Sequence, residues 1–175
     1  MRVTVRTALR GVVASLTLVS ILSCGEERAT GVEPLTRVSG PAPRLVQCPT
    51  DQTQRTQAVV GLLGGTVQLG ATAIRIPPGA LTVPTLITLT VPASKYVEIE
   101  VQAEDFTSFL FQQPVSISID YSRCRHSDVL RHTLTAWQID PLTKALLEKQ
   151  TSRDDKASRT VTFTTGHLSG YAVAF

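Results

Sequence analysis

Apolar and polar residues alternate along several short segments of this chain after residue 59. The clearest is PVSISIDYS, residues 114–122, where aliphatic side chains and Tyr121 alternate with serines and Asp120. Because successive side chains of a strand point to opposite faces of a sheet, this alternation predicts strands with one buried and one solvated face. The same pattern occupies residues 87–91 and 97–101, and further strands are expected at residues 135–139, 161–163 and 171–175.

Short strands are therefore expected throughout residues 59–175, separated by turns that contain glycine, proline and charged residues. No window repeats convincingly with the period of an α-helix, although residues 127–132 could form a turn. About nine short strands over this length favour a single antiparallel β-sandwich. The predicted fold class is all-β, with one domain over residues 59–175.

Residues 24–58 are polar and are interrupted by prolines at positions 34, 41, 43 and 49. Neither a period of 2 nor a period of 3.6 is sustained there beyond a few residues. Such a segment is typical of a flexible linker. We therefore predict that the linker occupies residues 24–58 and that the sandwich begins at Val59.

Residues 1–23 have the layout of a secretory signal, with three arginines before an apolar run over residues 11–22. At about 1.5 Å per residue this run reaches only about 18 Å, well short of a hydrocarbon core of about 30 Å. The run ends in ILSC, which resembles the signal box of bacterial lipoproteins, where the cysteine is diacylated and becomes the mature N-terminus. The resemblance implies a lipid on Cys24. The alternative is a plain secretory signal that leaves Cys24 without a role.

Lipidation of Cys24 would also determine the location, because two or three acyl chains hold a protein stably at a membrane whereas one does not. The expected location is the cell envelope, with lipid-free secretion as the alternative. Gly25 follows the cysteine at the position where inner-membrane lipoproteins of Gram-negative bacteria tend to carry aspartate. This residue favours the outer membrane if the host is Gram-negative.

The charge balance changes once the signal is set aside. The whole chain has 17 Lys and Arg against 14 Asp and Glu, but three of the arginines lie in the signal. The part from Cys24 onward is therefore neutral overall, with no basic stripe in the sequence that would neutralise phosphates. We expect no nucleic-acid partner.

The stretch GGTVQLGATAIRIPPGAL, residues 64–81, places glycines and prolines where a chain reverses direction. Glycine tolerates a positive φ, and two successive prolines lack the N–H groups that the interior of a sheet requires. No Gly-Lys-Ser/Thr follows, so the stretch is not a phosphate-binding loop. Its structural residues are Gly64, Gly65, Pro77, Pro78 and Gly79.

This stretch resembles the opening of the ZU-five domain, a β-sandwich module of zona-occludens, uncoordinated-five and ankyrin proteins. Residues 111–119 are similar to the family's Phe-x-x-Pro-Val strand, Trp137 stands at the position of a late aromatic, and His167-Leu168-Ser169 resembles a closing His-Phe-Ser. The likeness covers residues 64–175 and implies a non-enzymatic interaction or structural module. The expected partner is an unknown protein or wall polymer, and no cofactor is expected.

Two cysteines remain after Cys24, and an even pair in an exported protein predicts a disulfide between Cys48 and Cys124. The alternative is two free, buried thiols. The run CRHSDVLRH, residues 124–132, gathers possible metal ligands, but its spacing matches no zinc pattern and a disulfide would occupy Cys124. A charged loop without metal is the prediction for this run.

The closing motif His167-Leu168-Ser169 also raises the possibility of self-cleavage, because similar motifs break the bond before the hydroxyl residue. His167 would act as general base on Ser169, whose oxygen would attack the carbonyl of Leu168. Such a reaction needs strain at the turn. The alternative, which we favour, is that His167 caps a loop while residues 171–175 form a buried final strand.

Other chemistry is weakly represented. The acidic pairs at residues 104–105 and 154–155 are predicted to belong to turns, and no pair of carboxylates is placed for glycoside cleavage. A carbohydrate-binding sandwich, the third hypothesis, would use exposed aromatics, for which Trp137 and Tyr96 are the candidates.

Overall fold

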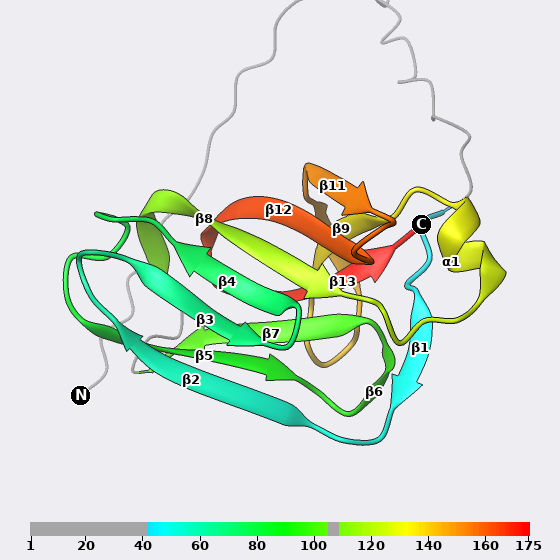
Figure 1. Ribbon diagram of the computed structural model, residues 1–175, viewed down its shortest axis with the longest axis horizontal. Coiled ribbons are helices and arrows are strands. Elements are labelled where there is room, and N and C mark those ends of the chain that lie inside the picture. Colours follow the sequence, from blue (N-terminus) through cyan, green and yellow to red (C-terminus); the bar gives the residue numbers. More distant parts are fainter. Residues whose placement is uncertain (1–41, 105–108) are drawn as a thin grey trace, which may run out of the picture. The chain divides into compact units, whose positions relative to one another are not determined.

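The computed structural model describes residues 42–104 and 109–175. In this part of the chain thirteen strands form three antiparallel sheets, and one short helix lies between two of the strands in sequence (Figure 1). The all-β sandwich predicted from the alternating segments is therefore confirmed. The predicted signal at residues 1–23, Cys24 and the part of the predicted linker up to residue 41 lie outside the described residues.

The first sheet has six strands in the order β10-β9-β13-β7-β5-β2. Its inward positions carry the alternating apolar residues: Leu89 lies opposite Val101, and Ile99 lies opposite Tyr171. All four are almost completely buried, as the period-2 pattern requires. The strands are β2 (Gln54–Val60), β5 (Thr85–Val91), β7 (Glu98–Ala103), β9 (Thr135–Ile139), β10 (Leu146–Lys149) and β13 (Gly170–Ala174).

The second sheet has five strands in the order β11-β12-β8-β4-β3. Ile117 lies between Ile74 on one neighbouring strand and Phe163 on the other, and all three belong to the core. Serines and threonines of the same strands face outward, so this layer has one apolar and one polar face. Its strands are β3 (Gly65–Leu69), β4 (Thr72–Ile76), β8 (Leu110–Asp120), β11 (Ser152–Asp155) and β12 (Thr160–His167).

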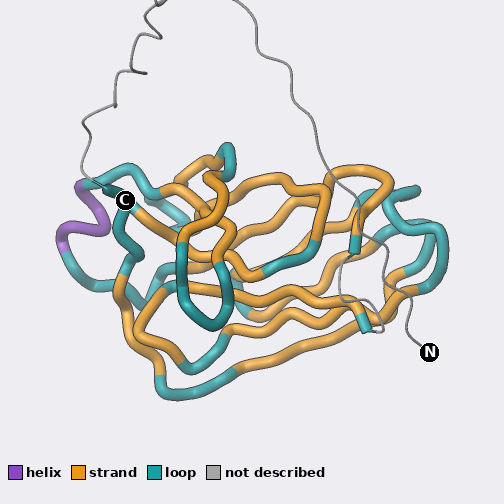
Figure 2. Tube along the Cα trace, turned by 180° about the vertical axis from the view of Figure 1, so that it is seen from behind, coloured by secondary structure: helices purple, strands orange, loops and turns teal. Residues whose placement is uncertain are grey.

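A small third sheet pairs β1 (Gln47–Thr50) with β6 (Ser94–Tyr96). Helix α1 (Ser127–Arg131) and the C-terminus lie at the same end of the domain, at the right of Figure 1. Arg123 ties the small sheet together, because its Nε donates to the carbonyl of Cys48 and its Nη2 donates to the carbonyl of Tyr96, both at 2.8 Å. Figure 2 shows the helix beside the C-terminal residue from behind.

The predicted boundary at Val59 is wrong, because the folded part already includes β1 and β2. Val46 is completely buried and its N–H donates to the carbonyl of Val173, while β2 pairs with β5 over its whole length. The sequence of β2 resembles a linker because it is an edge strand whose polar residues face solvent. Pro49 is tolerated because β1 pairs with β6 alone.

The glycine and proline motif forms two adjoining turns at the other end of the sandwich. Gly64 has a φ of 73°, and a Cβ added there would overlap the carbonyl of Ile76, so only glycine fits. Gly79 has a φ of 78° and its N–H donates to the carbonyl of Leu62 at 2.8 Å. The turn after β2 and the loop after β4 are therefore held against each other.

Candidate functional site

The His167-Leu168-Ser169 motif crosses from one layer of the sandwich to the other. β12 of the second sheet ends at His167, and β13 of the first sheet begins at Gly170. The register of β12 against β8 shifts between Thr165 and His167. The three residues are therefore a connection between sheets, and each is partly exposed.

Gln138 of β9 stands between the two side chains that self-cleavage would require. Its Oε1 lies 3.1 Å from His167 Nε2, and its Nε2 donates to Ser169 Oγ at 3.1 Å. The other ring nitrogen, Nδ1, lies 3.4 Å from Thr165 Oγ1. His167 and Ser169 share no hydrogen bond, so the imidazole is not placed to take the hydroxyl proton.

The backbone around the motif is held by ordinary contacts. The carbonyl of Ser169 accepts the N–H of Val101 at 3.1 Å, and the carbonyl of His167 accepts the Tyr171 hydroxyl at 2.7 Å. None of the residues 166–170 has a positive φ. Burial raises the pKa of Tyr171 to about 12, so this phenol is a stable hydrogen-bond donor at neutral pH. The arrangement can fix the connection between the sheets, and none of its residues is strained by a left-handed backbone conformation.

We expect the purified protein to remain uncleaved at this motif. Intact mass measurement should give a single species for the protein, and Ser169→Ala should differ from it by one oxygen atom only. The physical reason is that Gln138 blocks proton transfer from Ser169 to His167. A fragment ending at Leu168, absent from the alanine variant, would contradict this expectation.

The predicted disulfide between Cys48 and Cys124 is present, with the two Cα atoms 5.3 Å apart. It joins β1 to the loop that follows β8. Cys124 therefore carries no thiolate for a metal, and the ring of His132 instead stacks on Phe175 with centroids 5.3 Å apart. Among the described residues no group of three or more potential ligands could hold a metal ion. The side chain of Asp128 lies outside the described part of the chain.

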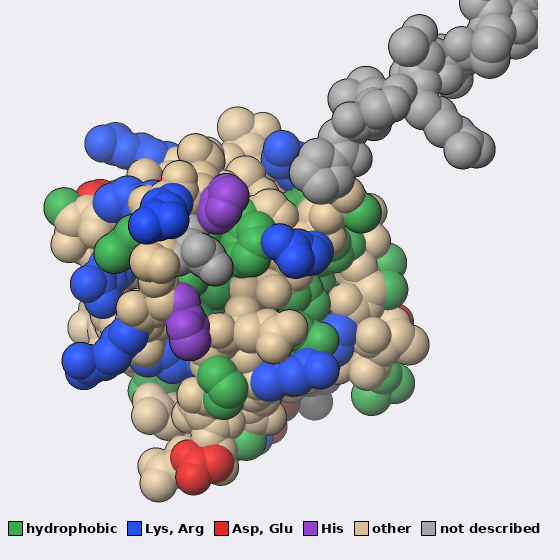
Figure 3. All heavy atoms as spheres, turned by 90° about the vertical axis from the view of Figure 1, so that its right-hand side faces the viewer, with side chains coloured by type: hydrophobic (Ala, Val, Ile, Leu, Met, Phe, Trp, Pro, Cys, Tyr) green, Lys and Arg blue, Asp and Glu red, His purple; other side chains and the backbone are tan. Residues whose placement is uncertain are grey.

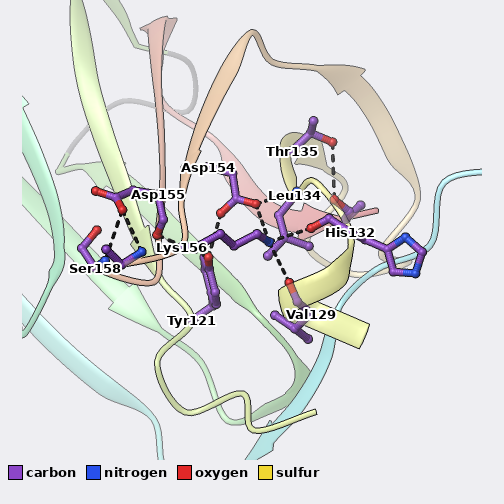
Figure 4. A network of polar contacts seen from close by, with 11 residues as sticks. Tyr121, Val129, His132, Leu134, Thr135, Asp154, Asp155, Lys156 and Ser158 are labelled. Carbon is purple, nitrogen blue, oxygen red and sulfur yellow. Dashed lines mark hydrogen bonds and ion pairs between the residues drawn. The ribbon is translucent and has the colours of Figure 1, made fainter. Parts of the chain in front are cut away.

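Asp154, which was predicted to belong to a turn, lies in β11 and its buried side chain is the centre of a network of polar contacts (Figure 4). Its carboxylate accepts the Tyr121 hydroxyl at 2.7 Å and the N–H of Leu134 at 2.8 Å, and it pairs with Lys156 at 2.7 Å. Burial, and then Asp154, raise the pKa of the Tyr121 phenol far above its ordinary value. Asp155 is the last residue of β11, and its carboxylate accepts N–H groups of the turn that follows, which hold its pKa below the usual range.

Lys156 extends this network to the short helix. Its Nζ donates to the carbonyls of Val129 and His132 at 2.7 Å and 2.6 Å, at the C-terminal end of α1 (Figure 4). Carbonyls at a helix C-terminus have no partner within the helix, and a cation is their favourable partner. The network is structural: it attaches α1 to the turn after β11.

The turn after β2 and the loop before β5 lie at the end of the domain opposite the small sheet, at the left of Figure 1, and both carry exposed apolar residues. Leu63 is 88 % exposed in the turn after β2, and Leu62 beside it is 56 % exposed. Val59 on β2 and Val83 in the loop before β5 are also exposed, and Val60 pairs with Thr85 between them. We call the four exposed residues Val59, Leu62, Leu63 and Val83 the apolar tip. Periodicity did not reveal them, because they lie in turns or at a strand end.

Two shallow depressions lie on the outer faces of the sheets. One, of about 260 Å³, lies between Arg55 and Glu104 on the first sheet. The other, of about 380 Å³, lies beside Arg75 and Pro77 on the second sheet. Neither brings together a buried acid and base. The aromatics considered for carbohydrate binding are half-buried and engaged, since Trp137 donates to Thr135 and the ring of Tyr96 faces Lys95.

The fold and these sites define a class of protein: a disulfide-linked all-β sandwich with an apolar tip. Comparison of the chain with protein-family models and with curated proteins gives no match. In the described part of the chain, no helix has the length and apolar character needed to cross a membrane.

Proposed function

We propose that this protein is an envelope-anchored, non-enzymatic interaction module of a bacterial lipoprotein that holds a protein partner at its apolar tip. The observation that carries the proposal is the exposure of Leu62 and Leu63 at the end farthest from the point where the chain joins the domain. Burial of a leucine side chain is favourable by about 1.5–3 kcal/mol, so two adjacent exposed leucines favour association with a partner that covers them.

The anchor in this proposal is a lipid on Cys24. The cysteine follows the signal-like residues 1–23, and residues 25–41 link it to the described domain. A domain held in this way stays in the cell envelope, at the outer membrane if the host is Gram-negative. If Cys24 is not lipidated, the same domain is secreted.

The sandwich is suited to such a role because its anchored end is firmly held. Arg44 and Phe175 exchange two backbone hydrogen bonds, and the disulfide follows at Cys48. Disulfides persist in the oxidising compartments that exported proteins occupy. The ZU-five-like motif supports the same class of function, since its glycines and prolines here build the turns that carry the apolar tip.

The proposal predicts that a photoreactive residue at position 63 forms a covalent adduct of defined mass in the producing cells. The matched control position is Thr162, which faces outward on the second sheet, and it should give no such adduct. Equal adducts at both positions, or none at position 63, would contradict a partner at the tip. Co-sedimentation with purified wall polymer would then identify the polymer alternative.

Substitution of both leucines tests the same surface quantitatively. Leu62→Ser with Leu63→Ser should leave the free energy of unfolding within about 0.5 kcal/mol of the parent, because both side chains are exposed. The affinity for the cross-linked partner, once purified, should fall about ten-fold or more. Isothermal titration with the partner measures this change, and an unchanged affinity would exclude the tip as its binding surface.

A further inference from the structure

The end of the sandwich opposite the apolar tip is rich in cations. Figure 3 looks directly at this end and shows blue Lys and Arg side chains spread over it. Four exposed cations come from separate parts of the chain whose contacts connect them: Arg44, Lys95, Arg125 and Arg131. We call these four residues the basic end.

Contacts among neighbouring groups place the four cations on one surface. The guanidinium of Arg44 lies 5.3 Å from the centre of the Phe175 ring, which stacks in turn on His132, the residue after Arg131. Lys95 belongs to β6, whose partner β1 carries Cys48. The disulfide from Cys48 to Cys124 brings in Arg125, the next residue along the chain.

The charges of the basic end are available to an external partner. The other cations nearby are engaged: Lys156 with Asp154, and Arg123 and Arg159 with backbone carbonyls. Within the described part of the chain, Arg125 and Arg131 have neither an ion pair nor a hydrogen bond. Arg44 and Lys95 face only aromatic rings, which leave their N–H groups free to bind oxygen. Helix α1 also contains Asp128, whose side chain lies outside the described part.

An exposed leucine accompanies these cations. Leu130 on α1 is 46 % exposed and precedes Arg131. Cations around an apolar side chain match the surface of an anionic bilayer, where the headgroups carry negative charge and the acyl region receives the apolar group. Duplex DNA would instead favour a continuous basic stripe that follows its phosphates.

We propose that the basic end docks on an anionic phospholipid surface. The chain reaches the domain at this same end, since residues 44–46 pair with residues 173–175 there. Seventeen residues separate Cys24 from Ala42, which is at most about 60 Å of extended chain. A lipid on Cys24 would therefore keep the basic end at a high effective concentration near the membrane, so that weak electrostatic attraction suffices.

Docking in this way would orient the domain on the membrane. The contribution of the lipid on Cys24 rests on the proposed function. With the basic end on the membrane, the apolar tip points away from it, toward partners in the surrounding space. The attraction itself does not require the lipid. It can therefore be tested on protein that carries none.

The test is sedimentation of the mature chain, with Cys24→Ser to exclude lipidation, together with lipid vesicles. Vesicles of phosphatidylcholine mixed with phosphatidylglycerol in equal parts should bind it, and vesicles of phosphatidylcholine alone should not. Raising the salt should weaken binding, because the attraction is screened. Arg125→Glu with Arg131→Glu should weaken binding to the anionic vesicles at least ten-fold.

The matched control is Arg55→Glu with Arg75→Glu, which changes the net charge equally on the outer faces of the two sheets. It should retain binding. Equal losses in both double variants, binding to neutral vesicles, or tighter binding to duplex DNA would each overturn the proposal. The milder Arg125→Gln with Arg131→Gln serves if charge reversal disturbs folding. Photo-cross-linking at position 63 reports on the apolar tip separately, so failure at one end leaves the other result intact.

Discussion

Replacing Asp154 by alanine is expected to lower the free energy of unfolding by about 2–5 kcal/mol, because a buried hydroxyl and a buried N–H both lose the carboxylate to which they donate. The side chain of Asp154 is only 3 % exposed. Its loss would take the carboxylate away from the hydroxyl of Tyr121 and the N–H of Leu134, while the ammonium of Lys156 would keep the two carbonyls at the end of α1. Urea unfolding followed by the fluorescence of Trp137, the chain's single tryptophan, measures the effect.

The neighbouring Asp155 provides the matched control. Its carboxylate accepts N–H groups of Ala157 and Ser158 within its own turn. Asp155→Ala should therefore destabilise the protein much less than Asp154→Ala, because the hydrogen bonds that it removes are exposed to solvent. If the two substitutions destabilised the protein equally, the buried network would not be the source of the effect.

This pair also shows why the sequence could not distinguish the two aspartates. Both stand in the polar run SRDDKAS and look like turn residues. Burial of Asp154 depends on Tyr121 and Leu134, which are 33 and 20 positions away in the chain. Local pattern contains no information about such distant partners.

The strands, too, could be predicted only where their local pattern reflects their place in the fold. β8 is predicted correctly because its alternate apolar residues are buried in the core, and the all-apolar β13 because every one of its residues is buried. The linker prediction fails at β2 and the short β1, because strands at the edge of a sheet can carry mostly polar residues. Pattern therefore predicts central strands better than edge strands.

The candidate sites were predicted less well than the fold, for a related reason. His167 and Ser169 are neighbours in sequence, but Gln138, which separates their side chains, comes from another strand. The basic end is not visible in the sequence, because its four cations lie far apart in a chain that is neutral overall from Cys24 onward. Net charge does not show where in space the charges lie.

Loss of the Cys48–Cys124 disulfide is the other change with a large expected effect. It closes a loop of 76 residues, so its removal should cost about 4 kcal/mol in the chain-entropy model. The comparison is between the parent and Cys48→Ala with Cys124→Ala, both carrying Cys24→Ser, in urea. The intact mass of the denatured parent should rise by two hydrogen atoms on reduction, and that of the double variant should not.

Reductant supplies the internal control, since it should lower the stability of the parent to that of the double variant and leave the variant unchanged. Equal unfolding midpoints of oxidised and reduced parent would contradict the prediction. Because β1 pairs only with β6, the disulfide is the covalent link that holds this strand to the rest of the domain. Hydrogen exchange in β1 and β6 should therefore accelerate in the reduced protein before exchange in the core strands does. The basic end would loosen with β1, so vesicle binding by the reduced protein should weaken under conditions in which the two main sheets remain folded.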